Sequence, residues 1–405
     1  MLFSVPETAK SQSNLGCRDL LGGRFPAIEG TGGMFFRVEP DMLMYNRLSD
    51  EMVDQIGDLA KALSANGTTL VLLPMPTKAL VMSERLGPDA AQFGYDPSLA
   101  ATIYADTLAR LDAAGVTLID VRAVLRNANA QSQPYFDADS RLNNAGLLAL
   151  ARAFAEGVVG ADTSGIATET VGTTELASVE RLSLQSQCLM SLPEVSSPDV
   201  RLDTAEVPDG STASRIMLAN TDLTGQSDLN FVHYLAGLSG LPVAQHSVTD
   251  SGVAAAASAL TSDTFWDLRP EYLIWELPLW QNPGRHGDQP LRELIAAAKG
   301  QCGQELVAER TDTGKLRVDL PQLDRPKVHS LLLQLGDQAT RRADFGFTSA
   351  QGQVRSRSIL RPEDQQPTTR FLMPMTGLWP DGAETVEVTS DAIADGDAKV
   401  FLCEG

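Results

Sequence analysis

Residues 49–73 read SDEMVDQIGDLAKALSANGTTLVLL, and this stretch decides the fold. Ser49 can accept a hydrogen bond at the start of a helix over 50–65. The apolar residues that share one face of this helix are Met52, Val53, Ile56, Leu59, Ala60 and Leu63. Asn66-Gly67 ends the helix, and residues 69–73 form a continuous apolar run of the kind found in buried parallel strands. The stretch therefore predicts one unit of an α/β sheet.

The same alternation continues toward residue 300. The further strands are expected at 116–120, 216–219, 241–244 and 272–276, and the further helices at 99–111, 144–157, 228–238 and 252–260. Repeated strand and helix units of this kind build a sheet with helices on both faces. We therefore predict a three-layer α/β domain over 1–300, with a connector or lid over 160–212 that is rich in Thr, Ser, Pro and acidic residues.

The pattern changes after residue 301. Short segments that alternate polar and apolar residues are separated by Gly, Pro, Asp and Gln. The expected strands lie at 316–320, 328–335, 343–348, 354–360, 371–375, 384–388 and 399–402. Such spacing is typical of antiparallel sheets. We predict an all-β sandwich domain over 301–405.

Composition excludes several classes of partner. The 405 residues include 32 Lys and Arg against 52 Asp and Glu, so the formal net charge is −20. A surface this acidic repels phosphates, which argues against nucleic acid and against anionic membranes. The chain has no run of 18 apolar residues, so we expect no membrane span. Its first seven residues, MLFSVPE, lack the basic start and apolar core of a secretory signal.

Four cysteines, at positions 17, 188, 302 and 403, form an even set without a CxxC pair. None has the spacing to His that a zinc site requires. Three disulfide pairings are possible, and four buried, reduced thiols are equally compatible with the sequence. Bridges would place the chain in an oxidising compartment, because cytosolic thiols are kept reduced.

Motifs for the common hydrolase and nucleotide chemistries are absent, including GxSxG, Walker A, HExxH and a dinucleotide GxGxxG. We accordingly predict no metal and no cofactor. Two polar segments follow expected strands or precede helices, 135–146 and 218–224, and both read as caps and turns. His246 follows the end of a strand, where α/β sheets place their sites.

Three motifs carry a resemblance to a known family. IEGTGGMFFR at 28–37 is similar to a family opening EGxxGWLF, LLPMPTKAL at 72–80 resembles PVPPRAL, and LIWELP at 273–278 resembles LIWEFP. Their order resembles the AlgX/AlgJ family of alginate O-acetyltransferases, which are periplasmic SGNH hydrolase-like proteins. The resemblance covers essentially the whole chain. It implies an SGNH-hydrolase-like α/β domain followed by a carbohydrate-binding-type β-sandwich, and the disulfides Cys17–Cys188 and Cys302–Cys403.

The catalytic positions depart from the family pattern. The family segment DxHWTPxG falls on 139–146, so Asp139 keeps the orienting carboxylate but Arg141 stands where the general-base His belongs. The nucleophile turn GTSxS falls on 220–224, so Asp222 stands at the serine position. Serine acyl transfer needs a hydroxyl and a neutral base, and arginine stays protonated. We expect a catalytically inactive site in which Arg141 and Asp222 form a charge pair.

The resemblance thus predicts a periplasmic protein of alginate-type exopolysaccharide modification or secretion, with its signal peptide removed, that binds polysaccharide without transferring acetyl groups. Arg37, Lys78 and Trp379 are the candidate ligand-binding residues, two for acidic sugars and one for stacking. An active O-acetyltransferase or esterase with a rearranged site is the alternative, with Ser251 as nucleophile and His246 as base. A ligand-free scaffold for other exopolysaccharide secretion proteins is the third possibility.

Overall fold

The computed structural model describes residues 13–44, 46–205, 214–286, 289–299, 302–312, 314–322, 328–363, 365–393 and 397–404. The N-terminal residues 1–12, the end of the 160–212 connector and the expected domain boundary at 300–301 lie outside this set. Among the described helices, none is both long and apolar enough to cross a membrane.

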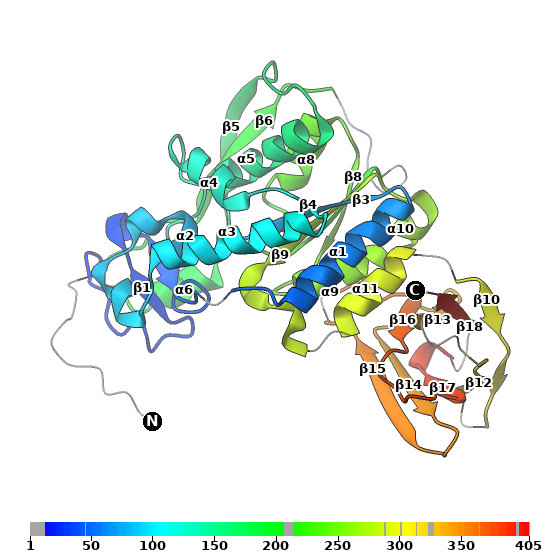
Figure 1. Cartoon of the computed structure of the whole chain (residues 1–405). Helices are drawn as coiled ribbons and strands as arrows, with labels where there is room; N and C mark the ends of the chain where they lie inside the picture. The colour runs from blue at the N-terminus through cyan, green and yellow to red at the C-terminus, as the bar shows by residue number, and fades with distance from the viewer. Residues whose placement is uncertain are drawn as a thin grey trace.

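A five-stranded parallel sheet forms the centre of the first domain (Figure 1). Its strand order is β4-β3-β9-β7-β8, and all four strand pairs are parallel. The strands are β3 (Thr69–Met75), β4 (Thr117–Leu118), β7 (Ile216–Asn220), β8 (Val243–Ser247) and β9 (Tyr272–Pro278). The three central strands are almost wholly buried, as their continuous apolar sequences require. This arrangement confirms the predicted α/β fold class.

Helices cover both faces of this sheet. Helices α1 (Asp50–Ala65), α9 (Gly252–Leu260) and α11 (Gln289–Lys299) pack together on one face, and α5 (Asn144–Phe154) and α8 (Phe231–Ser239) pack on the other (Figure 1). The other α-helices in the described part of the chain are α2 (Lys78–Val81), α3 (Pro97–Ala113), α4 (Val121–Asn129), α6 (Val179–Gln185) and α10 (Asp263–Leu268). Helix α1 begins as predicted, because the Ser49 side chain accepts a hydrogen bond from the Met52 backbone N–H.

The described part of the connector lies in two places. The hairpin of β5 (Thr168–Glu175) and β6 (Ser196–Leu202) packs beside α5, whereas α6, in the long connection between these two strands, packs beside β1 (Ala27–Glu29) and β2 (Phe35–Arg37) (Figure 1). The disulfide Cys17–Cys188 ties the loop after α6 to the N-terminal segment, beside the hairpin of β1 and β2. This bridge is one of the two predicted disulfides and is confirmed.

The C-terminal region is an antiparallel β-sandwich, as predicted. One sheet has the order β10-β18-β13-β16 and the other β11-β12-β17-β14-β15. The strands of the first sheet are β10 (Gln304–Leu306), β13 (His329–Leu335), β16 (Arg370–Pro374) and β18 (Ala398–Glu404). Those of the second are β11 (Ala308–Arg310), β12 (Leu316–Asp319), β14 (Arg342–Thr348), β15 (Val354–Leu360) and β17 (Thr385–Thr389). The short strands β10 and β11 were not predicted, since three residues carry too little alternation to recognise.

The four-stranded sheet joins the two domains. In β13 the alternate residues Leu331 and Leu333 belong to the core of the sandwich, whereas Leu332 between them packs into the core of the α/β domain. Arg361 and Glu293 form an ion pair across the same junction, and both side chains are buried. The disulfide Cys302–Cys403 fastens β18 to the chain entering the sandwich, which confirms the second predicted bridge.

Candidate functional site

The loop that precedes α5 carries Asp139 and Arg141 at the predicted base end of the site. The Arg141 guanidinium donates two hydrogen bonds to the Asp139 carboxylate, from Nε to Oδ1 at 2.8 Å and from Nη2 to Oδ2 at 2.7 Å. Only 3% of Asp139 and 8% of Arg141 are exposed. Burial alone would raise the pKa of Asp139, but the hydrogen bonds and the charge of Arg141 outweigh it, so that this pKa is lowered. Asp139 is therefore an ionised carboxylate with a permanent counter-charge.

The predicted charge pair between Arg141 and Asp222 is wrong. Asp222 lies in the turn after β7, and its Oδ1 accepts a hydrogen bond from the Asp250 backbone N–H at 3.1 Å. No ion pair joins these two residues, both of which the structure describes. The two loops are nevertheless neighbours, because the Leu142 N–H donates to the Leu223 carbonyl at 3.3 Å. The Arg141 guanidinium binds Asp139 and not Asp222 because Asp139 lies two residues from Arg141 in the chain. Asp139 is also more deeply buried than the half-exposed Asp222.

Glu276 of β9 organises the turn that holds Asp222. This fully buried carboxylate accepts the Thr221 backbone N–H at 3.1 Å and the hydroxyls of Thr221 and Thr224. Burial raises the pKa of Glu276 to about 7, although the hydrogen bonds from Thr221 and Thr224 oppose the shift. In the sequence, Glu276 is the only acidic or basic residue of an otherwise apolar strand, which marks it as a buried carboxylate.

The raised pKa of Glu276 makes stability depend on pH. Between about pH 4.5 and 7 the folded state binds a proton at Glu276 that the unfolded state has released, so this contribution to stability falls as the pH rises through that window. Glu276→Gln keeps an oxygen acceptor and cannot ionise. We expect the variant to gain stability relative to the unsubstituted chain from about pH 5 to about pH 8, measured by urea unfolding. A stability difference that is the same at both pH values would contradict this assignment.

Ser251 and His246, the nucleophile and base of the alternative prediction, contact residues of α9 and do not contact each other. The Ser251 hydroxyl caps the helix by accepting from the Ala254 N–H at 3.2 Å. His246 Nδ1 lies 3.2 Å from the Ser258 hydroxyl, and burial lowers the pKa of His246 to about 4. No hydrogen bond joins the two within the described residues. The structure thus does not assemble the expected nucleophile and base pair.

Lys78 occupies a structural position. Its Nζ donates to four backbone carbonyls, those of Phe35, Phe136, Asp137 and Asp139, at 2.6–3.0 Å. Only 3% of Lys78 is exposed. Burial lowers the pKa of its ammonium group, although the negative charges of nearby carboxylates oppose this shift. These contacts use every N–H of the ammonium group. Lys78 is therefore committed to holding the β2 strand against the Asp139 loop, and no donor is left for a sugar.

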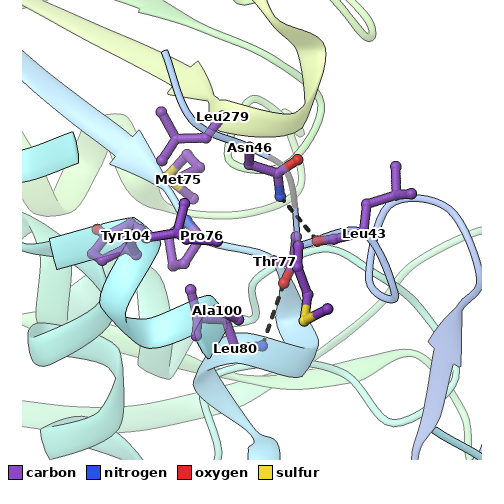
Figure 2. Close-up of a pocket in the computed structure, with 11 residues that line it drawn as sticks. Leu43, Asn46, Met75, Pro76, Thr77, Leu80, Ala100, Tyr104 and Leu279 are labelled. Carbon is purple, nitrogen blue, oxygen red and sulfur yellow. Dashed lines mark hydrogen bonds between the residues drawn. The ribbon is translucent and has the colours of Figure 1, made fainter. Parts of the chain in front are cut away.

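A small pocket opens at the carboxyl end of β3 beside the Asp139 loop. Its lining includes Arg37, Lys78, Ser140, Leu223 and Trp280. The Arg37 Nε is buried without a hydrogen-bond partner, and its role in binding a ligand stays a prediction. Met75 and Pro76 also line a second pocket, which is mostly apolar (Figure 2).

Trp379 lies in the sandwich, far along the chain from these pockets. The Arg355 guanidinium stacks over its ring at 5.0 Å, and its Nε1 donates to the Gln353 side chain at 2.9 Å. The ring is half-buried. On the same face of β15, Arg357 lines a groove with Arg292 of α11, at the junction of the two domains. The structure thus places Trp379 beside a row of arginines.

Within the part of the chain that the structure describes, no group of three or more His, Cys, Asp or Glu side chains is placed to hold a metal ion.

Comparisons with known proteins match either nearly the whole chain or a part of it. The solved structure of Pseudomonas aeruginosa AlgX is similar with a TM-score of 0.75 at 20% identity, over 96% of each chain. The O-acetyltransferase domain of Pseudomonas putida AlgJ is similar with a TM-score of 0.52 at 22% identity, over 67% of this chain and 98% of that one. No curated protein sequence matches. A family model described as the SGNH hydrolase-like domain of acetyltransferase AlgX matches residues 34–279. This match spans more than half of the chain, which therefore belongs to the AlgX family of SGNH hydrolase-like acetyltransferase domains.

Proposed function

We propose that this protein binds an acidic exopolysaccharide in the periplasm and does not transfer acetyl groups by the Ser-His-Asp route. The observation that carries the proposal is the buried, bidentate pair of Arg141 with Asp139, at the position where the family has its general base. The two disulfides fit an oxidising compartment such as the periplasm. The polysaccharide is taken to be alginate-like, by analogy with the family.

The chemistry of the replaced residues supports the loss of activity. A serine nucleophile passes its proton to a neutral imidazole, and a carboxylate fixes the orientation of that imidazole. A guanidinium keeps its protons at any relevant pH, so Arg141 has no site for the proton. Asp222 would form a mixed anhydride on attack and has no base to activate water for its hydrolysis. Removal of a triad's nucleophile or base costs several orders of magnitude in rate.

Charge placement supports the binding of an acidic glycan. The chain carries a net charge of −20, yet Arg355, Arg357 and Arg292 gather along β15 and its junction with α11. Trp379 adds an aromatic ring at one end of this row. Sugar rings stack on aromatic faces, and guanidinium charges attract carboxylates, here from Arg355 and Arg357 side chains that also donate to backbone carbonyls between Pro374 and Leu378. The groove would therefore attract a uronate polymer against the overall negative field of the protein.

Replacement of Trp379 tests the binding proposal. We expect Trp379→Ala to weaken the binding of a uronate oligosaccharide about tenfold, because an aromatic stacking contact contributes roughly 1–1.5 kcal/mol. Isothermal titration calorimetry measures the affinity. Val354→Ala is the matched control, since Val354 is an exposed side chain on β15 and we expect the affinity of this variant to be unchanged. Absence of any binding by the unsubstituted chain at millimolar oligosaccharide would overturn the proposal.

A second candidate function is docking of other secretion proteins. The observation that favours it is a group of exposed apolar side chains on α6 and the loop after it: Val179, Leu182, Leu189 and Met190. Exposed apolar groups of this kind often mark contact surfaces. Co-purification of partners with the unsubstituted chain, and its loss in Leu182→Asp with glycan binding intact, would establish docking as a separate role.

A further inference from the structure

The segment 176–195 lies across the Asp139 loop and touches Asp139, Ser140 and Arg141. Ser178 donates its hydroxyl proton to Asp139 Oδ2 at 2.6 Å, and the Ala177 carbonyl accepts from Arg141 Nη2 at 3.0 Å. Glu180 accepts from both the backbone N–H and the hydroxyl of Ser140, at 3.1 and 2.9 Å. These contacts cover the carboxylate that the family uses in catalysis.

Arg141 connects the Asp139 loop to the covering segment 176–195. Its guanidinium binds Asp139 within the loop and, through the same Nη2 atom, the Ala177 carbonyl in the covering segment. An imidazole at position 141 lacks a third donor in that geometry, because it carries only two ring nitrogens. Arg141, which stands where the family has its base, therefore also forms a hydrogen bond that holds segment 176–195 against the Asp139 loop.

The middle of the segment packs separately from the main core, whereas Leu176 and Val195 at its two ends belong to the core of the α/β domain. Leu184 and Leu192 pack with Ala27, Phe35 and Ala138 in a small cluster that is distinct from the cores of the two domains. The disulfide Cys17–Cys188 anchors the loop next to this cluster. Arg181 binds the Leu192 and Pro193 carbonyls, which closes the segment on itself. Segments with few core contacts open with lower free energy than the global transition.

We propose that residues 176–195 form a strap that opens and closes over the former catalytic centre, with Arg141, Ser178 and Glu180 as its latch and Cys17–Cys188 as its tether. Opening breaks the latch contacts, uncovers Asp139 and Ser140, and widens access to the pocket at Arg37. The tether keeps the strap close, so that closing needs no refolding of the domain. The strap is independent of whether the sandwich binds a glycan.

Amide hydrogen exchange tests the strap on the full chain. The Ser140 N–H is the reporter, because its acceptor Glu180 belongs to the strap. We expect Ser178→Ala and Glu180→Ala each to speed exchange of the Ser140 amide and of the strap amides about tenfold, while the amides of β3 and β9 are unchanged. The double variant Cys17→Ser/Cys188→Ser should speed strap exchange further, since the tether is then lost.

Capping provides the control for this experiment. Ser178 also caps α6 by accepting the Arg181 N–H, so loss of the cap alone would affect only the first turn of that helix. Ser262→Ala removes the corresponding cap of α10 and should leave the Ser140 amide unchanged. The strap is refuted if the Ser140 amide keeps its protection in both latch variants, or if β3 and β9 exchange faster together with the strap.

Discussion

The double variant Arg141→His/Asp222→Ser is expected to hydrolyse p-nitrophenyl acetate about 100-fold faster than the unsubstituted chain, which should show only the background rate. The substitutions restore a proton acceptor and a hydroxyl nucleophile, and general-base catalysis alone contributes roughly 10²–10⁴-fold. Asp139 is already in place to orient the imidazole, with Ser178 bound to its other oxygen. The two loops are adjacent through the bond between Leu142 and Leu223.

The single variants are the controls for this gain. Arg141→His lacks the nucleophile and Asp222→Ser lacks the base, so each should stay at the background rate. Hydrolysis by the unsubstituted chain that disappears in Ser251→Ala would instead show a rearranged active site. Hydrolysis that disappears in Asp222→Ala would show that the aspartate itself accepts the acyl group. Either of these outcomes contradicts the assignment of an inactive centre.

Lys78→Met is expected to destabilise the protein by about 3–5 kcal/mol, the usual cost of removing one partner from a buried charge cluster. The change leaves the carbonyls of Phe35, Phe136, Asp137 and Asp139 without their shared donor. It also removes the nearest counter-charge of Asp41, whose own pKa is raised by burial. Urea unfolding followed by circular dichroism measures the loss.

An exposed lysine supplies the comparison for Lys78. Lys61 lies on α1 in an exposed pair with Asp58, so Lys61→Met should change the free energy of unfolding by less than about 0.5 kcal/mol. A loss at Lys78 as small as this would show that its four carbonyl contacts contribute little. The Asp139 loop would then need another explanation for its position against β2.

The fold follows from the sequence where local patterns and burial agree. The run at 69–73 is a buried central strand and Ser49 caps the helix before it, because both depend on neighbours in the sequence. Strand β15 has the predicted bounds, since its turn residues mark both ends. Strands β10 and β11 were missed because their pairing partners, β18 and β12, decide them.

The site was less predictable because its contacts join distant segments. The sequence identified Asp139 as the retained carboxylate and Arg141 and Asp222 as the altered positions, but it did not show which carboxylate the guanidinium binds. Which carboxylate pairs with Arg141 depends on how deeply each one is buried, and only the folded chain defines that burial. The roles of Glu180 and Ser178 come from a segment about 40 residues away from the Asp139 loop, and no local pattern marks them.

The most direct test is to follow an O-acetylated uronate oligosaccharide by proton NMR during incubation with the protein. Line broadening of the sugar signals reports binding, and the ester methyl signal reports transfer or hydrolysis. Our account predicts broadened sugar signals, with the ester methyl intensity constant over hours. Conversion of that signal to free acetate, at a rate that exceeds a protein-free control, would contradict it. So would sugar signals that stay sharp at millimolar protein.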